Sequence, residues 1–288
     1  MTGDDHALAR DLAAQAGTRL LELRAQGGDP DVLRKAGDRL SHEFLTAALA
    51  DRRPGDVVLS EEGADNPERL GAGRVWIVDP LDGTREFGEP GRTDWAVHVA
   101  LWERTGAGGG ELTAGAVALP AQDMVLSTLQ PPPQPQRCDI DAVITPTMSH
   151  RGGPGLSAGE AVEVNEDDEA GVTAAPRRIV VSRSRPPRFV RNISDLIDAE
   201  LVPLGSAGAK VAAVICGEVD AYVHGGGFYE WDTAAPVAVA RAAGFHASRI
   251  DGSALAYNQA DLMMPDILVC RPALAGVLLQ AIRELKEI

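Results

Sequence analysis

The sequence predicts an α/β (α+β) protein with a layered core, and three observations lead to this fold class. The first half begins with two amphipathic helical segments and continues with a series of short apolar runs that are typical of strands. The second half alternates strand-like and helix-like segments. The chain has 288 residues, 44% of them hydrophobic and 24% charged, which suits one large domain or two closely packed ones.

Two helices are predicted at the start of the chain. The first covers residues 7–26, ends at a Gly-Gly pair, and carries apolar residues at intervals of four positions: Leu8, Leu12, Ala16 and Leu20, with Leu23 near the same face. A second helix is predicted to follow Asp38, with a buried stripe made of Leu40, Phe44, Ala48 and Leu49. Because each helix has one apolar face, we expect both to pack on a sheet.

A run of strands is predicted next, at residues 57–59, 75–78, 95–102, 112–119 and 124–127, with the last ones forming a meander. In the strand at 95–102 alternate side chains face opposite sides, so His98 shares a face with Ala100 and Trp102. A single histidine in such surroundings is interpreted as structural rather than catalytic.

Residues 128–177 differ from the rest of the chain. They contain PPPQPQ, a glycine-rich stretch and the acidic NEDDEAG, with little apolar periodicity. This composition predicts a flexible surface insertion or linker between an N-terminal α+β part, residues 1–127, and a C-terminal α/β part, residues 178–288. In the second part we expect strands at 177–182, 201–205, 220–224 and 267–270, and helices at 189–200, 206–216, 231–243 and 273–285.

The charge and the apolar runs restrict the partners. A net charge of −15 argues against binding of a nucleic-acid polymer, but an acidic site can bind a small phosphorylated molecule when divalent cations lie between them. No apolar run approaches the roughly 20 residues needed to span a bilayer. The acidic N-terminus lacks the layout of a secretory signal, so a cytoplasmic location is expected. The cysteines, Cys138, Cys216 and Cys270, have no C-x-x-C spacing for zinc or redox chemistry.

The segment DPLDGT, residues 79–84, ends an apolar run with two carboxylates. Pro80 keeps Asp79 extended at the strand end, and Gly83 permits close approach of a ligand to the backbone. A helix that begins near Thr84 would add free N–H groups beside the carboxylates, an arrangement suited to Mg²⁺ and phosphate. A strand followed by an ordinary Asx-type turn is the alternative.

Two other acidic segments strengthen the prediction of a metal site. Glu61-Glu62 follows the preceding strand and reaches the same sheet edge if the two strands are neighbours. Asp232 stands near the start of a predicted helix, where it can cap the helix or complete a metal site from the second part. Carboxylates gathered in one cleft raise one another's pKa unless cations lie between them.

The segment WIVDPLDGT, the upstream Glu-Glu and the downstream Trp-Asp-x-Ala-Ala resemble the inositol monophosphatase superfamily of Mg²⁺-dependent, lithium-sensitive phosphatases. The resemblance extends from the first helix to the last strand, except for residues 128–177. It implies a layered αβαβα sandwich of the inositol monophosphatase and fructose-1,6-bisphosphatase type. It also implies two or three bound Mg²⁺ ions.

The resemblance also implies roles for particular residues. The metal ligands would be Glu61, Asp79, Asp82, Asp232 and the Leu81 carbonyl oxygen. Thr84 and Asp38 would orient and deprotonate the attacking water, although Lys35-Ala36-Gly37 precedes Asp38 where the family has Thr-x-Ala. The substrate phosphate would lie against Glu61, Leu81, Asp82, Gly83, Thr84 and Asp232.

One branch of the superfamily fits best. Arg85-Glu86-Phe87 is similar to the Lys/Arg-Glu-Phe of CysQ-type 3′(2′),5′-bisphosphate nucleotidases, whereas inositol monophosphatases have Thr-Asn-Phe there. The segment Gly205-Ser206-x-x-x-Lys210 resembles the same branch, in which Ser206 and Lys210 would hold a second phosphate. The implied reaction is removal of the 3′-phosphate of adenosine 3′,5′-bisphosphate (PAP) to give AMP, and possible conversion of PAPS to APS, in sulfate assimilation. No covalent enzyme intermediate is expected.

Other functions stay open at this point. The same core serves inositol-1-phosphatases and fructose-1,6-bisphosphatases, and a non-catalytic regulator could bind nucleotide phosphates with it. The presence of both Asp38 and Thr84 favours an enzyme. Haloacid-dehalogenase phosphatases carry D-x-D-G-T, with one residue fewer between the acids, and in an extended strand this shift would change the face of one acid. A homodimer is a possible assembly.

Overall fold

The computed structural model describes residues 4–106, 109–134, 177–184 and 186–286. The chain divides into two units, one made of residues 1–135 and 177–288 and the other of residues 136–176. All described residues belong to the first unit. Most of the predicted insertion at 128–177 therefore lies outside the described residues, and the division into parts 1–127 and 178–288 stays a prediction.

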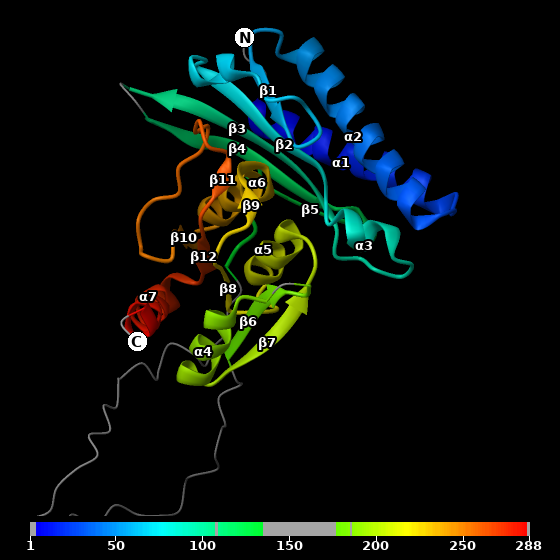
Figure 1. Ribbon diagram of the computed structural model, residues 1–288. Coiled ribbons are helices and arrows are strands. Elements are labelled where there is room, and N and C mark those ends of the chain that lie inside the picture. Colours follow the sequence, from blue (N-terminus) through cyan, green and yellow to red (C-terminus); the bar gives the residue numbers. More distant parts are fainter. Residues whose placement is uncertain (1–3, 107–108, 135–176, 185, 287–288) are drawn as a thin grey trace, which may run out of the picture. The chain divides into compact units, whose positions relative to one another are not determined.

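The first sheet has the strand order β1-β2-β3-β4-β5, with bounds Val57–Ser60, Arg74–Asp82, Ala96–Thr105, Gly109–Leu119 and Met124–Ser127. β1 and β2 are parallel, and the remaining neighbours are antiparallel, as expected for a meander. Helices α1 (Asp5–Ala25) and α2 (Pro30–Arg52) cover one face of this sheet (Figure 1). Their buried apolar side chains pack against Trp76 and Trp95 of that face.

The second sheet has the order β10-β12-β8-β6-β7, with bounds His246–Ser248, Ile267–Cys270, Ala221–His224, Arg177–Ser182 and Ala199–Leu204. Its outer face packs against α4 (Arg188–Ile197) and α7 (Pro272–Lys286), with Val190, Ile193 and Leu278 buried in between. A separate two-stranded antiparallel sheet is formed by β9 (Phe228–Tyr229) and β11 (Met263–Met264). Short 3₁₀ helices lie at Pro67–Leu70 and Pro120–Gln122, and α3 covers Thr84–Gly88.

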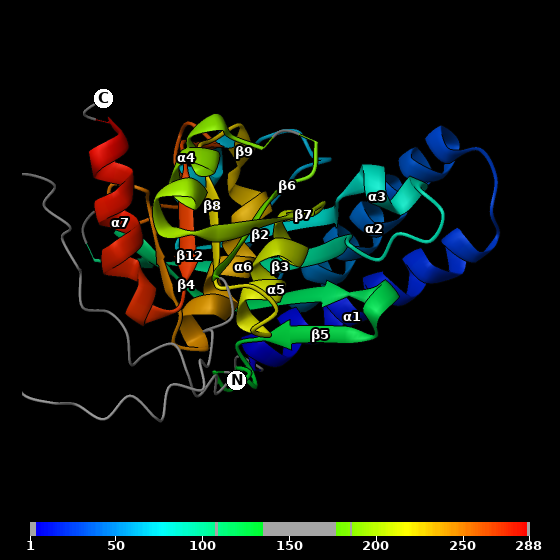
Figure 2. The same cartoon turned by 90° about the horizontal axis from the view of Figure 1, so that it is seen from below.

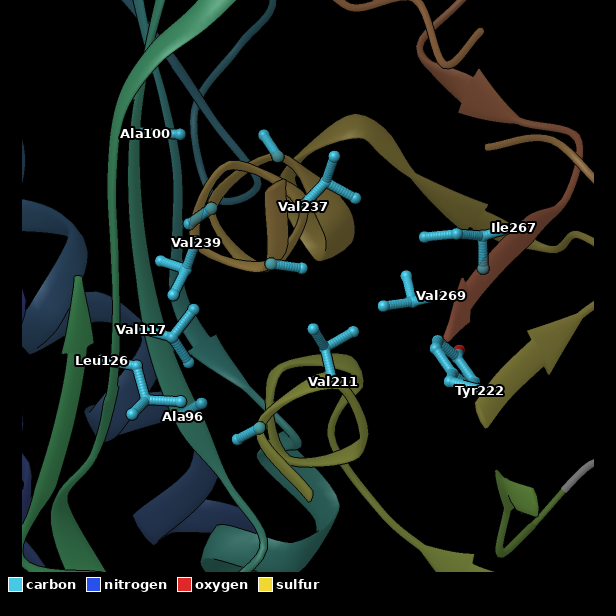
Figure 3. Packing of buried hydrophobic residues seen from close by; sticks show 14 of the residues in the cluster. Ala96, Ala100, Val117, Leu126, Val211, Tyr222, Val237, Val239, Ile267 and Val269 are labelled. Carbon is cyan, nitrogen blue, oxygen red and sulfur yellow. The ribbon is translucent and has the colours of Figure 1, made fainter. Parts of the chain in front are cut away.

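The helices α5 (Ala207–Ile215) and α6 (Glu230–Ala242) fill the space between the two sheets. Figure 3 shows Val211 of α5 and Val237 of α6 between Val117 of the first sheet and Val269 of the second. The same succession of helix pair, sheet, helix pair, sheet and helix pair is visible from below (Figure 2). These layers confirm the predicted αβαβα sandwich, because apolar residues on both faces of each sheet are covered.

Most predicted elements are present within a few residues of their expected bounds. The α1 stripe is confirmed, since Leu8, Leu12, Ala16 and Leu20 are all buried. The short strands β9, β10 and β11 were not predicted, because two or three residues carry too little periodicity to identify a strand. None of the described helices is both long enough and apolar enough to cross a bilayer.

The predicted start of α2 is wrong. The helix begins at Pro30, and the Asp29 side chain accepts hydrogen bonds from the backbone N–H groups of Asp31 and Val32. An acidic cap followed by proline at the first helical position is a strong signal for a helix start, so this start was predictable from the sequence. The buried stripe shifts accordingly to Gly37, Ser41, Leu45 and Leu49, while Leu40, Phe44 and Ala48 are half-buried. Asp38 therefore lies inside the helix and does not cap it.

Candidate active site

A β-bulge at the end of β2 places Asp79 and Asp82 on the same face of the first sheet. Asp79 is opposite His98 and Asp82 is opposite Ala96, so an advance of three residues along β2 corresponds to an advance of two residues along β3. In a regular strand, residues three apart point to opposite faces, and the extra residue of a bulge restores the match. The expectation that the D-x-x-D spacing turns one acid to the other face is therefore wrong. The Leu81 N–H closes the bulge by donating to Asp79 Oδ1 at 3.0 Å.

Two other carboxylates reach the same place from neighbouring elements. Glu61 follows the last residue of β1, whose parallel pairing sets Ser60 opposite Val78, and its carboxyl group is close enough to that of Asp79 for each to shift the other's pKa. Asp232 enters from the first turn of α6. One of its oxygens, Oδ2, accepts the backbone N–H of Tyr229 at 2.6 Å, so Asp232 caps its helix as well as facing the cluster.

The gathered carboxylates repel one another. Burial raises the pKa of Glu61 to about 7, and the charges of Asp232 and Asp82 add to this effect. Burial also raises the pKa of Asp232 to about 6, together with the charge of Asp82. The pKa of the fully buried Asp79 is raised well above its ordinary value by burial and by Glu61. A set of oxygen donors with excess negative charge is what a hard divalent cation requires.

The metal-binding capacity of this place also follows from distances. Ligand atoms of Asp79, Asp82 and His98 all lie within 4.8 Å of one another. Since Glu61 and Asp232 add oxygen donors from β1 and α6, the donor chemistry fits a divalent cation bound mainly by carboxylates. The structure thus brings together all the acids predicted as metal ligands.

Asp82 differs electrostatically from its neighbours. Burial raises its pKa, but the His98 ring, the Lys210 ammonium group and the Ser206 hydroxyl outweigh this effect and lower the pKa to about 2. Its Oδ2 accepts a hydrogen bond from Ser206 Oγ at 2.5 Å and another from the Gly208 N–H at 2.7 Å. Asp82 is therefore fixed as a carboxylate by the start of α5, with Oδ2 committed to these donors.

His98 lies beside Asp82 and links it to the backbone of α6, so its interpretation as a structural residue stays a prediction. The ring is fully buried, with Nε2 at 3.2 Å from Asp82 Oδ2 and Nδ1 at 3.1 Å from the Trp231 carbonyl oxygen. Nδ1 is thus engaged by a carbonyl oxygen, whereas Nε2 approaches Asp82 without a hydrogen-bond partner among the described residues. The cross-strand pairing of His98 with Asp79 indicates this position, but it is known only once the register of β3 on β2 is known.

Asp38 and Thr84 meet beside the carboxylates. Thr84 Oγ1 lies 3.3 Å from Asp38 Oδ1 and 2.9 Å from the Leu81 carbonyl oxygen. Burial raises the pKa of Asp38 to about 6, and the charge of Glu62 adds to this effect. Gly37 makes the approach of α2 possible, since a Cβ there would lie 2.8 Å from a ring carbon of Phe87.

Gly83 connects the acidic segment to α3 in a conformation that favours glycine. Its φ is 82°, and a Cβ there would lie 3.1 Å from both the Asp94 carbonyl oxygen and Ser206 Cβ. Positive φ together with this close approach explains why the turn after Asp82 needs glycine.

Ser206 and Lys210 are buried and bonded within the chain. Ser206 Oγ donates to Asp82 and accepts the Ala209 N–H at 2.9 Å, as an N-cap residue does. The Lys210 ammonium group donates to the Gly205 carbonyl and, at 2.9 Å, to the Ser206 carbonyl, and it lies 5.3 Å from the centre of the Tyr222 ring. In the structure both residues hold the start of α5 against Asp82.

A cavity of about 710 Å³ opens beside these groups. Asp82, Gly83, Thr84 and Arg85 line it from the end of β2 and the start of α3. Its wall continues along Ser206, Lys210, Tyr222, His224, the glycines 225–227 and Asp232. This volume suits a small molecule with several functional groups, and two of the clustered acids, Asp82 and Asp232, stand in its wall.

The fold and this arrangement of acids define a phosphatase family. The chain belongs to the inositol monophosphatase family, which it matches over residues 7–287. It is 47% identical over 286 residues to the 3′-phosphoadenosine 5′-phosphate phosphatase of Mycobacterium leprae, covering 97% of this chain and 94% of that protein.

More distant relatives agree. The 3′(2′),5′-bisphosphate nucleotidase CysQ of Escherichia coli K12 is 27% identical over 256 residues, covering 86% of this chain and 91% of that protein. The crystal structure of CysQ from Bacteroides thetaiotaomicron, a bacterial member of the inositol monophosphatase family, has a TM-score of 0.67 and 27% identity, covering 93% of this chain and 97% of that chain. These matches confirm the resemblance to the CysQ-type branch.

Proposed function

We propose that this protein is a metal-dependent 3′(2′),5′-bisphosphate nucleotidase that hydrolyses the 3′-phosphate of adenosine 3′,5′-bisphosphate to AMP and phosphate. PAPS, which has the same 3′-phosphate, is a second substrate of this class and would give APS. The observation that carries the proposal is the gathering of four mutually repelling acids, Glu61, Asp79, Asp82 and Asp232, near the Asp38–Thr84 pair. Asp82, Thr84 and Asp232 also line the cavity. The choice of substrate is supported by the relatives that act on 3′-phosphoadenosine 5′-phosphate.

Two or three Mg²⁺ ions would be held by Glu61, Asp79, Asp82, Asp232 and the Leu81 carbonyl oxygen. Bound there, Mg²⁺ lowers the pKa of water and neutralises the charge on the phosphate and leaving oxygens. The Leu81 carbonyl keeps a free lone pair for this purpose although Thr84 already donates to it. Asp82 offers Oδ1, since Oδ2 is committed to the start of α5.

Thr84 and Asp38 would prepare the attacking water. The Thr84 hydroxyl has one proton, which it donates to Leu81 or Asp38, and its lone pairs can accept a hydrogen bond from the water. Asp38 then takes the proton of the water. With a pKa of about 6 the group is ionised at neutral pH yet still basic enough to act as a general base.

The phosphate being hydrolysed would lie against the turn at Leu81–Thr84, between Glu61 and Asp232. Gly83 has no side chain, so the phosphate can approach the backbone of this turn. Ser206 and Lys210 were predicted to bind the second phosphate. We retain them in the substrate site as residues that support the cavity wall, since their polar atoms are engaged within the chain.

In the cell, this reaction would remove a by-product of sulfate assimilation in the cytoplasm, and it would be sensitive to lithium. The proposal involves a small nucleotide as substrate and no nucleic-acid polymer. The homodimer stays a prediction. Activity on inositol 1-phosphate or fructose 1,6-bisphosphate is the competing function, because the same acids would serve all these substrates.

The test is release of inorganic phosphate from adenosine 3′,5′-bisphosphate, inositol 1-phosphate and fructose 1,6-bisphosphate, each with Mg²⁺, with EDTA, and with added Li⁺. We expect preference for the bisphosphate nucleotide, no activity in EDTA and inhibition by Li⁺. A preference for either sugar phosphate would overturn the nucleotidase proposal. Full activity of Asp82→Asn would overturn the proposed metal ligands.

A further inference from the structure

Arg85 is a basic residue of the cavity wall whose guanidinium group is not bonded to any of the described residues. It follows Thr84 in α3, is exposed, and lines the cavity together with Asp82 and Thr84. Within the described part of the chain, its guanidinium group makes no hydrogen bond or ion pair. The wall therefore presents a free cation one residue from the group proposed to aim the water.

The other cation of this wall is committed elsewhere. Lys210 is buried, and its ammonium group donates to the carbonyl oxygens of Gly205 and Ser206. A phosphate would have to break these bonds in order to use it. Among the described residues that line the cavity, Lys210 and Arg85 are the lysine and arginine side chains, so Arg85 remains for a direct contact.

The acids nearest to Arg85 in sequence are bonded to another arginine, although the charge of Arg85 contributes to lowering the pKa of Glu89. Glu86 is buried and accepts hydrogen bonds from Arg183 Nε at 3.1 Å and Nη2 at 2.7 Å. Arg183 also binds Glu89, from Nη1 at 2.9 Å and from Nη2 at 2.8 Å. The hydrogen bonds of Glu86 and Glu89 thus go to Arg183, and the guanidinium group of Arg85 is left for a ligand.

We propose that Arg85 binds the second phosphate of the substrate, the one that is not hydrolysed, and so selects nucleoside bisphosphates over monophosphates. The inference rests on the proposed function and adds the group that recognises the substrate class. A guanidinium group forms paired charge-assisted hydrogen bonds with phosphate oxygens. In a site whose other charges are mostly acidic, a dianionic group distant from the bound metal needs such a partner.

The test compares two substrates that differ only in the second phosphate: adenosine 3′,5′-bisphosphate and adenosine 3′-monophosphate. The variants are Arg85→Met, which keeps the length of the side chain, and Arg85→Lys, which keeps the charge but loses the paired geometry. Arg10→Met is the control, since Arg10 is an exposed residue of α1 with only a 3.8 Å contact to Asp11. Thermal melting confirms that each variant is folded.

We expect Arg85→Met to lower kcat/KM for the bisphosphate by about 10- to 100-fold, as loss of a charge-assisted hydrogen bond does. For the monophosphate we expect a change of less than about threefold, with Arg85→Lys intermediate on the bisphosphate. Equal losses on both substrates, or none on either, would overturn the role of Arg85. Failure of the wild-type protein to hydrolyse the bisphosphate with Mg²⁺ would instead overturn the proposed function itself.

Discussion

His98 and Asp82 form a buried contact at the centre of the site, with His98 Nε2 at 3.2 Å from Asp82 Oδ2. The same ring reaches the Trp231 carbonyl oxygen through Nδ1, so it joins the end of β2 to the first turn of α6. Because Asp232 stands next to Trp231, the contact fixes the relative positions of two acids that come from elements far apart in the sequence.

We expect His98→Leu to destabilise the protein by about 3 kcal/mol, since it leaves the buried Asp82 carboxylate without one of its partners. Urea unfolding of His98→Leu, Asp82→Asn and the double variant measures this coupling. Once Asp82 is neutral, loss of His98 should cost less, so the double variant should be more stable than the sum of the single effects implies. Additive effects would show that the two side chains do not interact.

Asp79→Asn should make the metal-free protein more stable while abolishing activity. The variant removes the free energy needed to bury the Asp79 carboxylate beside Glu61, Asp82 and Asp232, or to protonate it there. Each kcal/mol of relief raises Tm by about 2 to 4 °C in a protein of this size. The measurement is thermal unfolding in EDTA and again with Mg²⁺, which should stabilise the wild-type protein far more than the variant. An unchanged or lower Tm in EDTA would contradict this account of the cluster.

Gly37→Ala should lower both activity and stability. The added methyl group would meet Phe87 and Leu81 at 2.8 and 2.9 Å, and relief of this clash would move α2 and Asp38 away from Thr84. Overpacking of this kind costs about 1 to 3 kcal/mol. Gly276→Ala in α7 is a matched control, because a Cβ there has no neighbour within 4 Å. That control should be neutral or slightly stabilising, and a Gly37→Ala enzyme with normal kcat would refute the packing argument.

Asp5 should make the stability depend on pH in acid. Its carboxylate accepts hydrogen bonds from Arg53 Nε at 2.7 Å and Arg74 Nη2 at 2.9 Å. Burial alone would raise the pKa of Asp5, but Arg74 and Arg53 outweigh it, so the pKa is lower in the folded than in the unfolded protein. The stabilisation is therefore present above the unfolded pKa of about 3.9 and is lost as pH falls through the folded pKa.

Asp5→Asn should accordingly cost about 1 to 2 kcal/mol at neutral pH. The difference from the wild-type protein should shrink as the pH falls below about 4. Urea unfolding at a series of pH values measures it. A difference that does not change with pH would exclude Asp5 as the titrating group.

The positions of the acids were predictable from the sequence because they depend on strand ends. Glu61 and Asp79 follow apolar runs, and parallel pairing of β1 with β2 brings such ends together. The family resemblance supplied the role of Asp38, and for Asp232 it decided between the two roles that the residues had left open, helix cap and metal ligand. The same resemblance implied the five layers, which periodicity alone suggests only as alternating elements.

The remaining features depend on contacts that a linear sequence does not encode locally. The place of His98 follows from the register of β3 on β2, which pairs it with Asp79 just before the bulge. The engagement of Lys210 follows from the turn at Gly205 and the cap at Ser206, which fold its ammonium group back onto two carbonyls. The start of α2 could have been predicted from Asp29-Pro30, but the apolar residues after Asp38 suggested a later start.

The β2 bulge means that the site depends on chain length as well as on residue type. Deleting one residue between Asp79 and Asp82 would straighten the strand and turn Asp82 toward α1 and α2, away from α5. No substitution elsewhere could reverse this, because the face to which a strand side chain points depends on the number of residues before it and not on their chemistry. Single-residue deletions at this point should therefore be less tolerated than any single replacement of the residues around it.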